Sequence, residues 1–297
     1  MPFDFNCPHC GGVTRVAEEF AGKHGPCIHC GRAVEIPPAP PSSRRGRGER
    51  PRNKAIVRVL GFGAAILAMA VLIGAAITAA IPVWKQARDV ALQHRSAANL
   101  RKIGLALRAY EADYGSYPPA FTVDSAGKPL LSWRVLILPY LDDKHKQLYD
   151  RFDHQLPWNA PQHMQLLREM PEVFVSPADD PAKAAFESTY HVFVGSGTMF
   201  PAPDTRRQQE IRDDRATTIL VIETSNGVTK WTEPRDVDVN TTDFQIHGAT
   251  SPILGGNNPA GAQALYADGD VGLIPFGTNA AILEAMTTID GGEAIGR

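Results

Sequence analysis

Residues 59–83 read VLGFGAAILAMAVLIGAAITAAIPV, a run of 25 residues without a charged side chain. As an α-helix this run would measure about 37 Å, and the hydrocarbon core of a bilayer is about 30 Å thick. Trp84 follows it, at the place of an interfacial aromatic. The run begins far from Met1 and lacks a small-x-small cleavage site, which argues against a cleaved signal peptide. The pattern predicts a transmembrane helix over residues 55–84.

The flanks of this run predict its orientation. After it come only Lys85, Arg88 and Arg95 in the equivalent stretch. Before it lie seven basic residues, which are Arg44, Arg45, Arg47, Arg50, Arg52, Lys54 and Arg58. Because basic residues stay on the cytoplasmic side, we expect a cytoplasmic N-terminus and an exterior C-terminal part. The basic run could also contact anionic lipid or nucleic acid, but its role in topology is the favoured interpretation.

All four cysteines of the chain lie in its first 30 residues, as Cys7-Pro8-His9-Cys10 and Cys27-Ile28-His29-Cys30. Two Cys-x-x-Cys turns at this separation are typical of a structural zinc site with four thiolate ligands. A segment of about 36 residues buries too little apolar surface to fold alone, so a metal would stabilise it. We therefore expect Cys7, Cys10, Cys27 and Cys30 to bind one structural Zn²⁺ in a zinc ribbon.

Two alternatives to zinc remain open from the residues. Disulfides are disfavoured by the short spacing and by the reducing compartment expected for this end of the chain. A redox-active Cys-x-x-Cys pair would lie beside a βαβ pattern, and neither pair does. His9 and His29 lie inside the two turns and are expected to be exposed, because four thiolates already complete a tetrahedron.

Composition divides the chain into four zones. Its 297 residues carry a net charge of −2 and are 43% hydrophobic, which is ordinary for a folded protein. We expect a zinc ribbon over residues 1–36 and a proline- and arginine-rich linker over residues 37–54. The transmembrane helix over residues 55–84 comes next, and residues 85–297 are long enough for one domain with its own core.

The pattern after the membrane predicts an α+β domain. An apolar seam at helical spacing continues the helix, to a total of about 55–60 residues, until Gly115 and Tyr117-Pro118-Pro119 end it. The seam consists of Leu100, Ile103, Leu107, Tyr110 and Tyr114. Short helices are expected over residues 133–141, 162–170 and 280–287. Strands are expected over residues 189–194 and 217–223, and residues 264–274 are expected to form two strands around an Asp268-Gly269 hairpin turn. The prediction is one long amphipathic helix packed on a mainly antiparallel sheet.

Residues 58–297 resemble a known family. The resemblance rests on these stretches: Ile81-Pro82-Val83, Gln86-Ala87-Arg88, residues 99–107, Tyr117-Pro118-Pro119-Ala120, residues 131–135, Leu138-Pro139-Tyr140-Leu141, Pro157-Trp158-Asn159, Thr218-Ile219-Leu220 and Ala267-Asp268-Gly269. Together they are similar to the prepilin-like family of unknown function that is abundant in planctomycete bacteria, also described as the His-x9-Asp-Gly prepilin-type family. The resemblance does not include the ribbon.

The resemblance implies a pilin- or pseudopilin-like architecture in the bacterial inner membrane, with the C-terminal domain on the periplasmic side and with no established catalytic activity. Two positions depart from the family. The prepilin peptidase site is reduced to Gly61-Phe62, and Ile66 stands where the family has a glutamate. Asn258 stands where the family has the histidine of its His-x9-Asp-Gly motif. Both departures favour a permanently anchored protein over a fibre subunit.

The sequence contains no recognisable catalytic constellation, so we expect that the protein is not an enzyme and takes no small-molecule substrate. The histidines are scattered, and Gly195-Ser196-Gly197 has neither nucleophile-elbow spacing nor a triad order. The acidic pairs at 142–143, 179–180 and 213–214 are expected in turns and caps, with calcium as the alternative. For Asp236, Asp238 and Asp243 a solvated strand edge is favoured over calcium.

The leading functional hypothesis is a membrane-embedded scaffold or binding module in envelope or secretion assembly, with protein partners on both faces of the bilayer. The first alternative is a transmembrane sensor whose ribbon binds a regulator or nucleic acid. Nucleic acid is the less favoured partner because Asp4, Glu18, Glu19 and Glu35 offset the basic residues of the ribbon. The second alternative is an exterior hydrolase.

Overall fold

A computed structural model describes residues 2–39, 54–178, 186–225, 229–248, 254–257, 260–293 and 295, with the side chains described from residue 67 onward in the long helix. The chain divides into two compact units, Met1–Ile73 and Gly74–Arg297. We describe each unit by itself.

The first unit begins with two small hairpins. Strand β1 (Phe3–Asn6) pairs with β2 (Val13–Val16), and β3 (His24–Pro26) pairs with β4 (Ala33–Glu35), both antiparallel. A short 3-10 helix, η1 (Glu18–Phe20), connects them. The buried side chains are Phe5, Cys7, Val16, Cys27 and Val34. Two of these five are cysteines, so little of this core is hydrocarbon.

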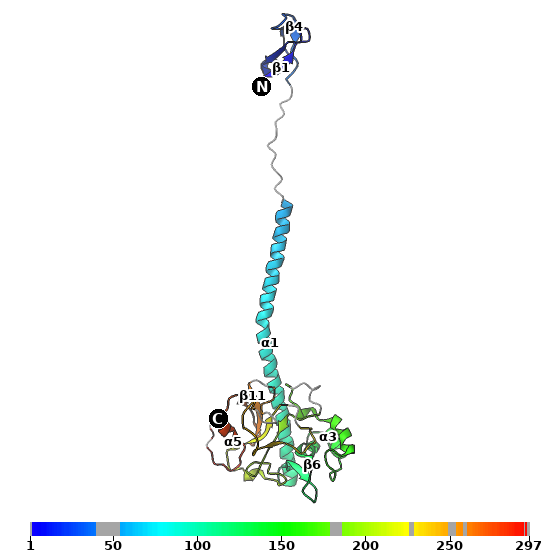
Figure 1. Ribbon diagram of the computed structural model, residues 1–297, viewed down its shortest axis with the longest axis vertical. Helices are drawn as coiled ribbons and strands as arrows, with labels where there is room; N and C mark the ends of the chain where they lie inside the picture. Colours follow the sequence, from blue (N-terminus) through cyan, green and yellow to red (C-terminus); the bar gives the residue numbers. More distant parts are fainter. Residues whose placement is uncertain are drawn as a thin grey trace. The chain divides into compact units, whose positions relative to one another are not determined.

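A single helix, α1 (Lys54–Tyr114), runs for 61 residues without interruption, slightly longer than the sequence predicts (Figure 1). Pro82 lies inside it. The helix ends where expected, because Gly115 adopts φ +75° and donates its N–H to the carbonyl of Glu111 at 2.7 Å. Glycine adopts this left-handed conformation without steric cost, which makes it the common residue after a helix.

The C-terminal turns of α1 pack into the second unit through the predicted seam. Leu100, Ile103 and Leu107 are completely buried, and β11 lies beside this part of α1 in Figure 1. The expected seam is too long by one turn, however, because the Tyr114 side chain is 62% exposed and stacks on Tyr110 at 4.4 Å between ring centroids. The core ends near Tyr110 since the chain leaves the helix at Gly115.

A four-stranded antiparallel sheet, in the order β12-β11-β9-β7, faces this helix. Its strands are β7 (Tyr190–His191), β9 (Ile219–Glu223), β11 (Gly261–Tyr266) and β12 (Val271–Pro275). Strands β11 and β12 form the predicted hairpin, in which Gly269 adopts φ +95°. Gly104 of α1 allows close packing on the sheet, because a Cβ there would lie 3.0 Å from Leu265 Cδ1.

Shorter elements complete the second unit. The helices are α2 (Trp133–Leu136), η2 (Leu138–Tyr140), α3 (Asp143–Tyr149), α4 (Pro161–Leu166), η3 (Leu167–Glu169), η4 (Glu172–Phe174), η5 (Gln208–Glu210) and α5 (Ala280–Ala285). Strand β5 (Phe121–Val123) pairs with β6 (Pro129–Ser132) in a hairpin that the sequence analysis does not predict. Strand β8 (Phe193–Val194) pairs in parallel with β10 (Val237–Asp238). The structure therefore confirms a mixed α+β fold with mainly antiparallel strands.

Candidate metal centre

The first Cys-x-x-Cys turn follows β1 directly. The N–H of Gly11 donates to the carbonyl of Cys7 at 2.9 Å, and the N–H of Cys7 donates to the carbonyl of Gly12 at 3.0 Å. Gly11 adopts φ +65°, which lets the chain reverse within four residues. This tight turn brings the side chains of Cys7 and Cys10 to the same side of the backbone.

The second turn repeats this geometry. Gly31 adopts φ +67° and donates its N–H to the carbonyl of Cys27 at 2.8 Å, and the N–H of Cys27 donates to the carbonyl of Arg32 at 2.8 Å. In addition, the N–H of His29 points at the Cys27 sulfur at 3.4 Å. Backbone N–H groups directed at sulfur stabilise a thiolate.

The two turns bring all four sulfurs together. The Sγ atoms lie within 4.8 Å of one another, with Cys7 and Cys30 at 3.9 Å and Cys10 and Cys27 also at 3.9 Å. A disulfide requires about 2.05 Å between its sulfurs, and all four cysteines are free. Four sulfurs at 2.3 Å from one central metal ion would be about 3.8 Å apart, so this arrangement is compatible with a tetrahedral metal site.

The electrostatics of the four thiols also favour a cation. Hydrogen bonds from the backbone N–H groups of His29 and Cys30 lower the pKa of the Cys27 thiol to about 6. The N–H of Gly12 lowers the pKa of Cys10, but desolvation and hydrogen bonding with the three other thiols outweigh it and raise that pKa to about 12. Without a metal, desolvation and the neighbouring thiols therefore keep Cys10 protonated, whereas a divalent cation would neutralise further thiolates.

The histidines of the two turns lie outside this cluster. His9 and His29 are exposed, as expected, and the His29 ring contacts the carbonyl of Val13 through Nε2 at 3.4 Å. The residues that could hold a metal are therefore the four cysteines that the sequence predicts.

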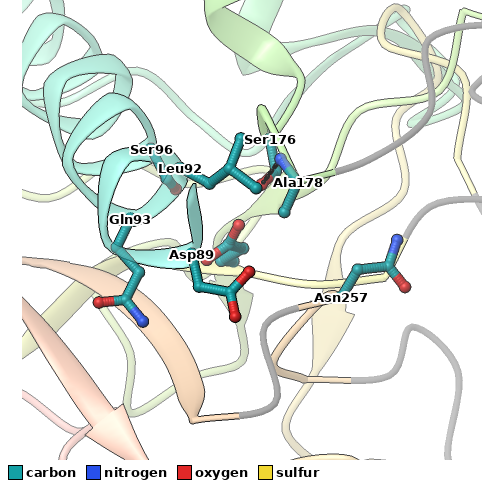
Figure 2. Close-up of a pocket in the computed structure, with 8 residues that line it drawn as sticks. Asp89, Leu92, Gln93, Ser96, Ser176, Ala178 and Asn257 are labelled. Atoms are coloured by element: carbon teal, nitrogen blue, oxygen red, sulfur yellow. Dashed lines mark hydrogen bonds between the residues drawn. The ribbon is translucent and has the colours of Figure 1, made fainter. Parts of the chain in front are cut away.

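A second candidate site lies inside the second unit, between α1 and the segments that carry Ser176 and Asn257. It is a small cavity of about 30 Å³. Figure 2 shows Asp89, Leu92, Gln93 and Ser96 on the helix at one side of this cavity and Ser176, Ala178 and Asn257 on the other. Glu223 of β9 also lines it. The Ser96 hydroxyl is already hydrogen-bonded with the Tyr190 hydroxyl at 2.8 Å.

A buried ion pair is the feature that the sequence analysis missed. Asp236 does not lie on a solvated edge as expected, because its side chain is 1% exposed and its Oδ1 accepts from Arg134 Nη2 at 2.7 Å. The same oxygen accepts from Trp133 Nε1 at 3.2 Å and from the N–H of Val192 at 3.0 Å. Burial lowers the pKa of Arg134 and raises that of Asp236, while their mutual attraction opposes both shifts. An arginine inside the apolar run 133–138 is the signal that could have indicated this pair.

The remaining donors of Arg134 also have partners. Its Nε donates to Ser188 Oγ at 3.0 Å, its Nη1 donates to Ser132 Oγ at 2.9 Å, and its Nη2 donates to the carbonyl of Tyr190 at 2.7 Å. A guanidinium satisfied in this way connects α2 to the strands around it. We interpret the Arg134–Asp236 pair as a structural ion pair that holds the elements of the core together.

Asp142 and Asp214 serve a cap and a turn, as predicted, whereas Asp213 bonds to a distant loop. Asp142 Oδ1 accepts from the N–H of His145 and caps α3. Asp213 accepts from the N–H groups of Gly291 and Gly292, and Asp214 accepts from that of Ala216. The pair at 179–180 and Asn258 lie outside the described residues.

Of the two buried histidines, His163 is bonded through both ring nitrogens, whereas His191 Nε2 has no hydrogen-bond partner among the described residues. His163 Nδ1 contacts the carbonyl of Pro157 at 2.9 Å, and its Nε2 accepts from the N–H of Asp153 at 3.1 Å. His191 Nδ1 contacts Thr224 Oγ1 at 2.8 Å. Burial lowers the pKa of His191 well below its usual value, and the charges of Arg134 and Arg235 lower it further, so the ring is neutral.

These features define a class, namely a mixed α+β protein built on one long apolar helix and preceded by a four-cysteine cluster. The chain belongs to the family described as "Protein of unknown function (DUF1559)", whose model matches residues 85–237, slightly more than half of the chain. No curated protein and no solved structure matches this chain.

The family match includes the C-terminal part of α1 and the Arg134–Asp236 pair. It confirms a family of unknown function but leaves the prepilin-type character as a prediction, since it begins at residue 85. The cysteine cluster also lies outside the matched range.

Proposed function

We propose that the protein is a single-pass membrane scaffold with a zinc ribbon on one face of the bilayer and a protein-binding domain on the other. The observation that carries the proposal is one long apolar helix, α1, that follows a four-cysteine cluster in the sequence and continues into a folded α+β domain. From Leu67 onward, α1 contains an apolar stretch that is long enough to cross a bilayer, and none of it is buried. Length and composition make this helix compatible with a membrane span.

The ribbon supports the cytoplasmic half of the proposal. Cys7, Cys10, Cys27 and Cys30 would ligate one structural Zn²⁺, because the distances between their sulfurs match those of a tetrahedral thiolate site. Four thiolates leave no open coordination position, so this zinc would stabilise a fold and would not activate water. The basic flank before the helix favours a cytoplasmic ribbon.

The second unit supports the non-enzymatic half of the proposal. Two sets of its buried ionisable groups serve packing, because Arg134 pairs with Asp236 and the ring nitrogens of His163 bond to the backbone. The domain would therefore act by presenting a surface. Envelope or secretion assembly in a bacterial inner membrane is the setting that the prepilin-like resemblance favours.

Proximity labelling of the full-length protein in cells tests the scaffold. A labelling enzyme fused to the N-terminus of the chain should mark cytoplasmic proteins, and one fused to its C-terminus should mark exterior proteins. Replacing Cys7 and Cys10 by serine should remove only the cytoplasmic set, whereas His9→Ala, a change in the same turn, should leave it intact. Identical protein sets from the two fusions would refute the two-faced arrangement. A cytoplasmic set that survives loss of both cysteines would refute the role of the ribbon.

A further inference from the structure

The four-stranded sheet has one exposed edge. Within the part of the chain that the structure describes, strand β12 pairs only with β11, and strand β7 at the opposite edge is fully buried. Proteins commonly block an exposed edge with lysine, proline or a bulge, because unpaired N–H and C=O groups invite another strand. Residues Val271-Gly272-Leu273-Ile274 of β12 carry none of these blocks, and the only one in the strand is its last residue, Pro275.

The register of the hairpin shows which backbone groups of β12 face outward. The carbonyl of Asp270 accepts from the N–H of Tyr266 at 2.9 Å, and the N–H of Phe276 donates to the carbonyl of Ala260 at 2.9 Å. Hydrogen-bonded positions alternate along an antiparallel strand, so residues 270, 272, 274 and 276 bond to β11. The backbone groups of Val271, Leu273 and Pro275 therefore point away from the sheet.

Only two of these three outward residues can accept a new strand. Pro275 has no N–H, and its carbonyl already accepts from the N–H of Thr278 at 3.2 Å and from Thr278 Oγ1 at 2.8 Å. Val271 and Leu273 each present one N–H and one C=O. Four backbone hydrogen bonds in a single register are thus open to an added segment.

A groove lies along this edge. It encloses about 620 Å³ and is lined mainly by apolar groups of β12, by Ile282 of α5 and by Ile295 near the C-terminus. The side chains of Leu273 and Ile282 are 37% and 47% exposed. Among the described residues that line it, Asp270 is the only charged one, and it lies at the hairpin end. A volume of this size suits a short peptide.

We propose that an extended segment of a partner protein binds here as an added strand, with backbone hydrogen bonds to Val271 and Leu273, apolar side chains in the groove and a basic side chain near Asp270. Main-chain bonds would provide affinity, and the side-chain positions would provide selectivity. This inference rests on the proposed scaffold function, for which it names the exterior surface and the kind of partner.

The size of the edge favours a peptide over a second copy of the chain. Strand β12 has five residues and is about 17 Å long, whereas a stable protein–protein interface buries about 1,200–2,000 Å². Edge-to-edge pairing of two copies would bury far less than that. A flexible segment, by contrast, can bond to the edge and fill the adjacent groove at the same time.

The experiment uses the full-length protein in detergent micelles and a phage-displayed library of random heptapeptides. We expect enrichment of β-forming sequences with a basic residue at one end. A fluorescent peptide from the enriched set should bind Leu273→Pro about tenfold or more weakly, because that variant loses one outward N–H and leaves a peptide carbonyl unpaired. The matched control Leu273→Thr keeps the backbone groups and should bind within about threefold of the wild type.

A second variant guards against misfolding of the proline variant. Asp270→Lys changes the exposed turn without touching the strand and should shift the enriched peptides from basic to acidic ends. Absence of any enriched family, or equal binding by the wild type and Leu273→Pro, would overturn the inference. A dimer in the wild type that Leu273→Pro abolishes would assign the edge to a second copy and overturn it as well. If the C-terminal fusion labels the same exterior proteins in Leu273→Pro as in the wild type, the scaffold proposal stands while the proposal of an added strand fails.

Discussion

Replacing Asp236 by asparagine removes the negative charge from the buried ion pair while conserving the shape of the side chain. The remaining carbonyl oxygen can still accept from Trp133 Nε1 and from the N–H of Val192. The guanidinium of Arg134, however, keeps its charge and stays completely buried. The variant therefore isolates the cost of an uncompensated cation in the core.

The structure sets the magnitude of this cost. At 2.7 Å, two unit charges attract by about 6 kcal/mol at an effective dielectric constant of 20. Hydrogen bonds from Arg134 to Ser132, Ser188 and the Tyr190 carbonyl persist and recover part of that energy. Breaking a buried pair costs about 3–5 kcal/mol, so Asp236→Asn should lower the free energy of unfolding by that amount. The melting temperature should fall by about 6–20 °C for a domain of this size.

Urea unfolding followed by tryptophan emission measures this effect in the full-length protein. The chain has four tryptophans and none in the ribbon, so the signal reports on the second unit, which includes Trp84. A double-mutant cycle with Arg134→Met and Asp236→Leu should give a coupling energy of about 2–3 kcal/mol. A loss below about 1 kcal/mol for Asp236→Asn, with an unchanged m-value, would refute the view that this pair organises the core.

Three further predictions follow from other sites. Cys27→Ser should reduce bound zinc from one per chain to nearly none by elemental mass spectrometry, and an unchanged zinc content would contradict a site with four thiolate ligands. The pKa of His191 is lower in the folded state than in the unfolded state. Just below pH 6.5, therefore, only the unfolded state takes up the proton of this histidine. The free energy of unfolding should fall by about 1.4 kcal/mol per pH unit as the pH drops from that point, until the folded pKa is reached. Urea midpoints measured across pH should lose this dependence in His191→Asn, and the dependence should persist in His154→Asn if His191 is its main source. Leu100→Ala should destabilise the second unit by about 2–5 kcal/mol in the urea assay, because the Leu100 side chain is completely buried. Leu105→Ala, at an exposed position of the same helix, is the control. Equal stabilities of the two variants would refute the conclusion that the seam packs in the core.

Local signals in the sequence predict much of this architecture. Gly115 ends α1, Asp268-Gly269 turns the β11–β12 hairpin, and the two Cys-x-x-Cys turns bring four sulfurs together. Each of these features depends on residues close in the chain. Composition and short-range spacing are enough to predict them.

The features that the sequence analysis missed depend on distant pairs or on the limits of the core. Arg134 and Asp236 are 102 positions apart, and the patterns around each give no indication of the other. Asp236 therefore reads as a surface carboxylate until the fold places it against α2. Tyr114 continues a perfect helical spacing, yet it lies beyond the end of the core and remains exposed.

The packing of Leu265 against Gly104 has a consequence for biogenesis. Leu265 follows Gly104 by 161 positions, so the apolar face of the helix is made long before the strand that covers it. At about 5–20 residues per second, this interval lasts roughly 8–30 s. During that time Leu100, Ile103 and Leu107 would lack the sheet that buries them in the finished protein, and their exposure favours aggregation. A chaperone or the membrane surface would have to shield this face until the C-terminal hairpin arrives.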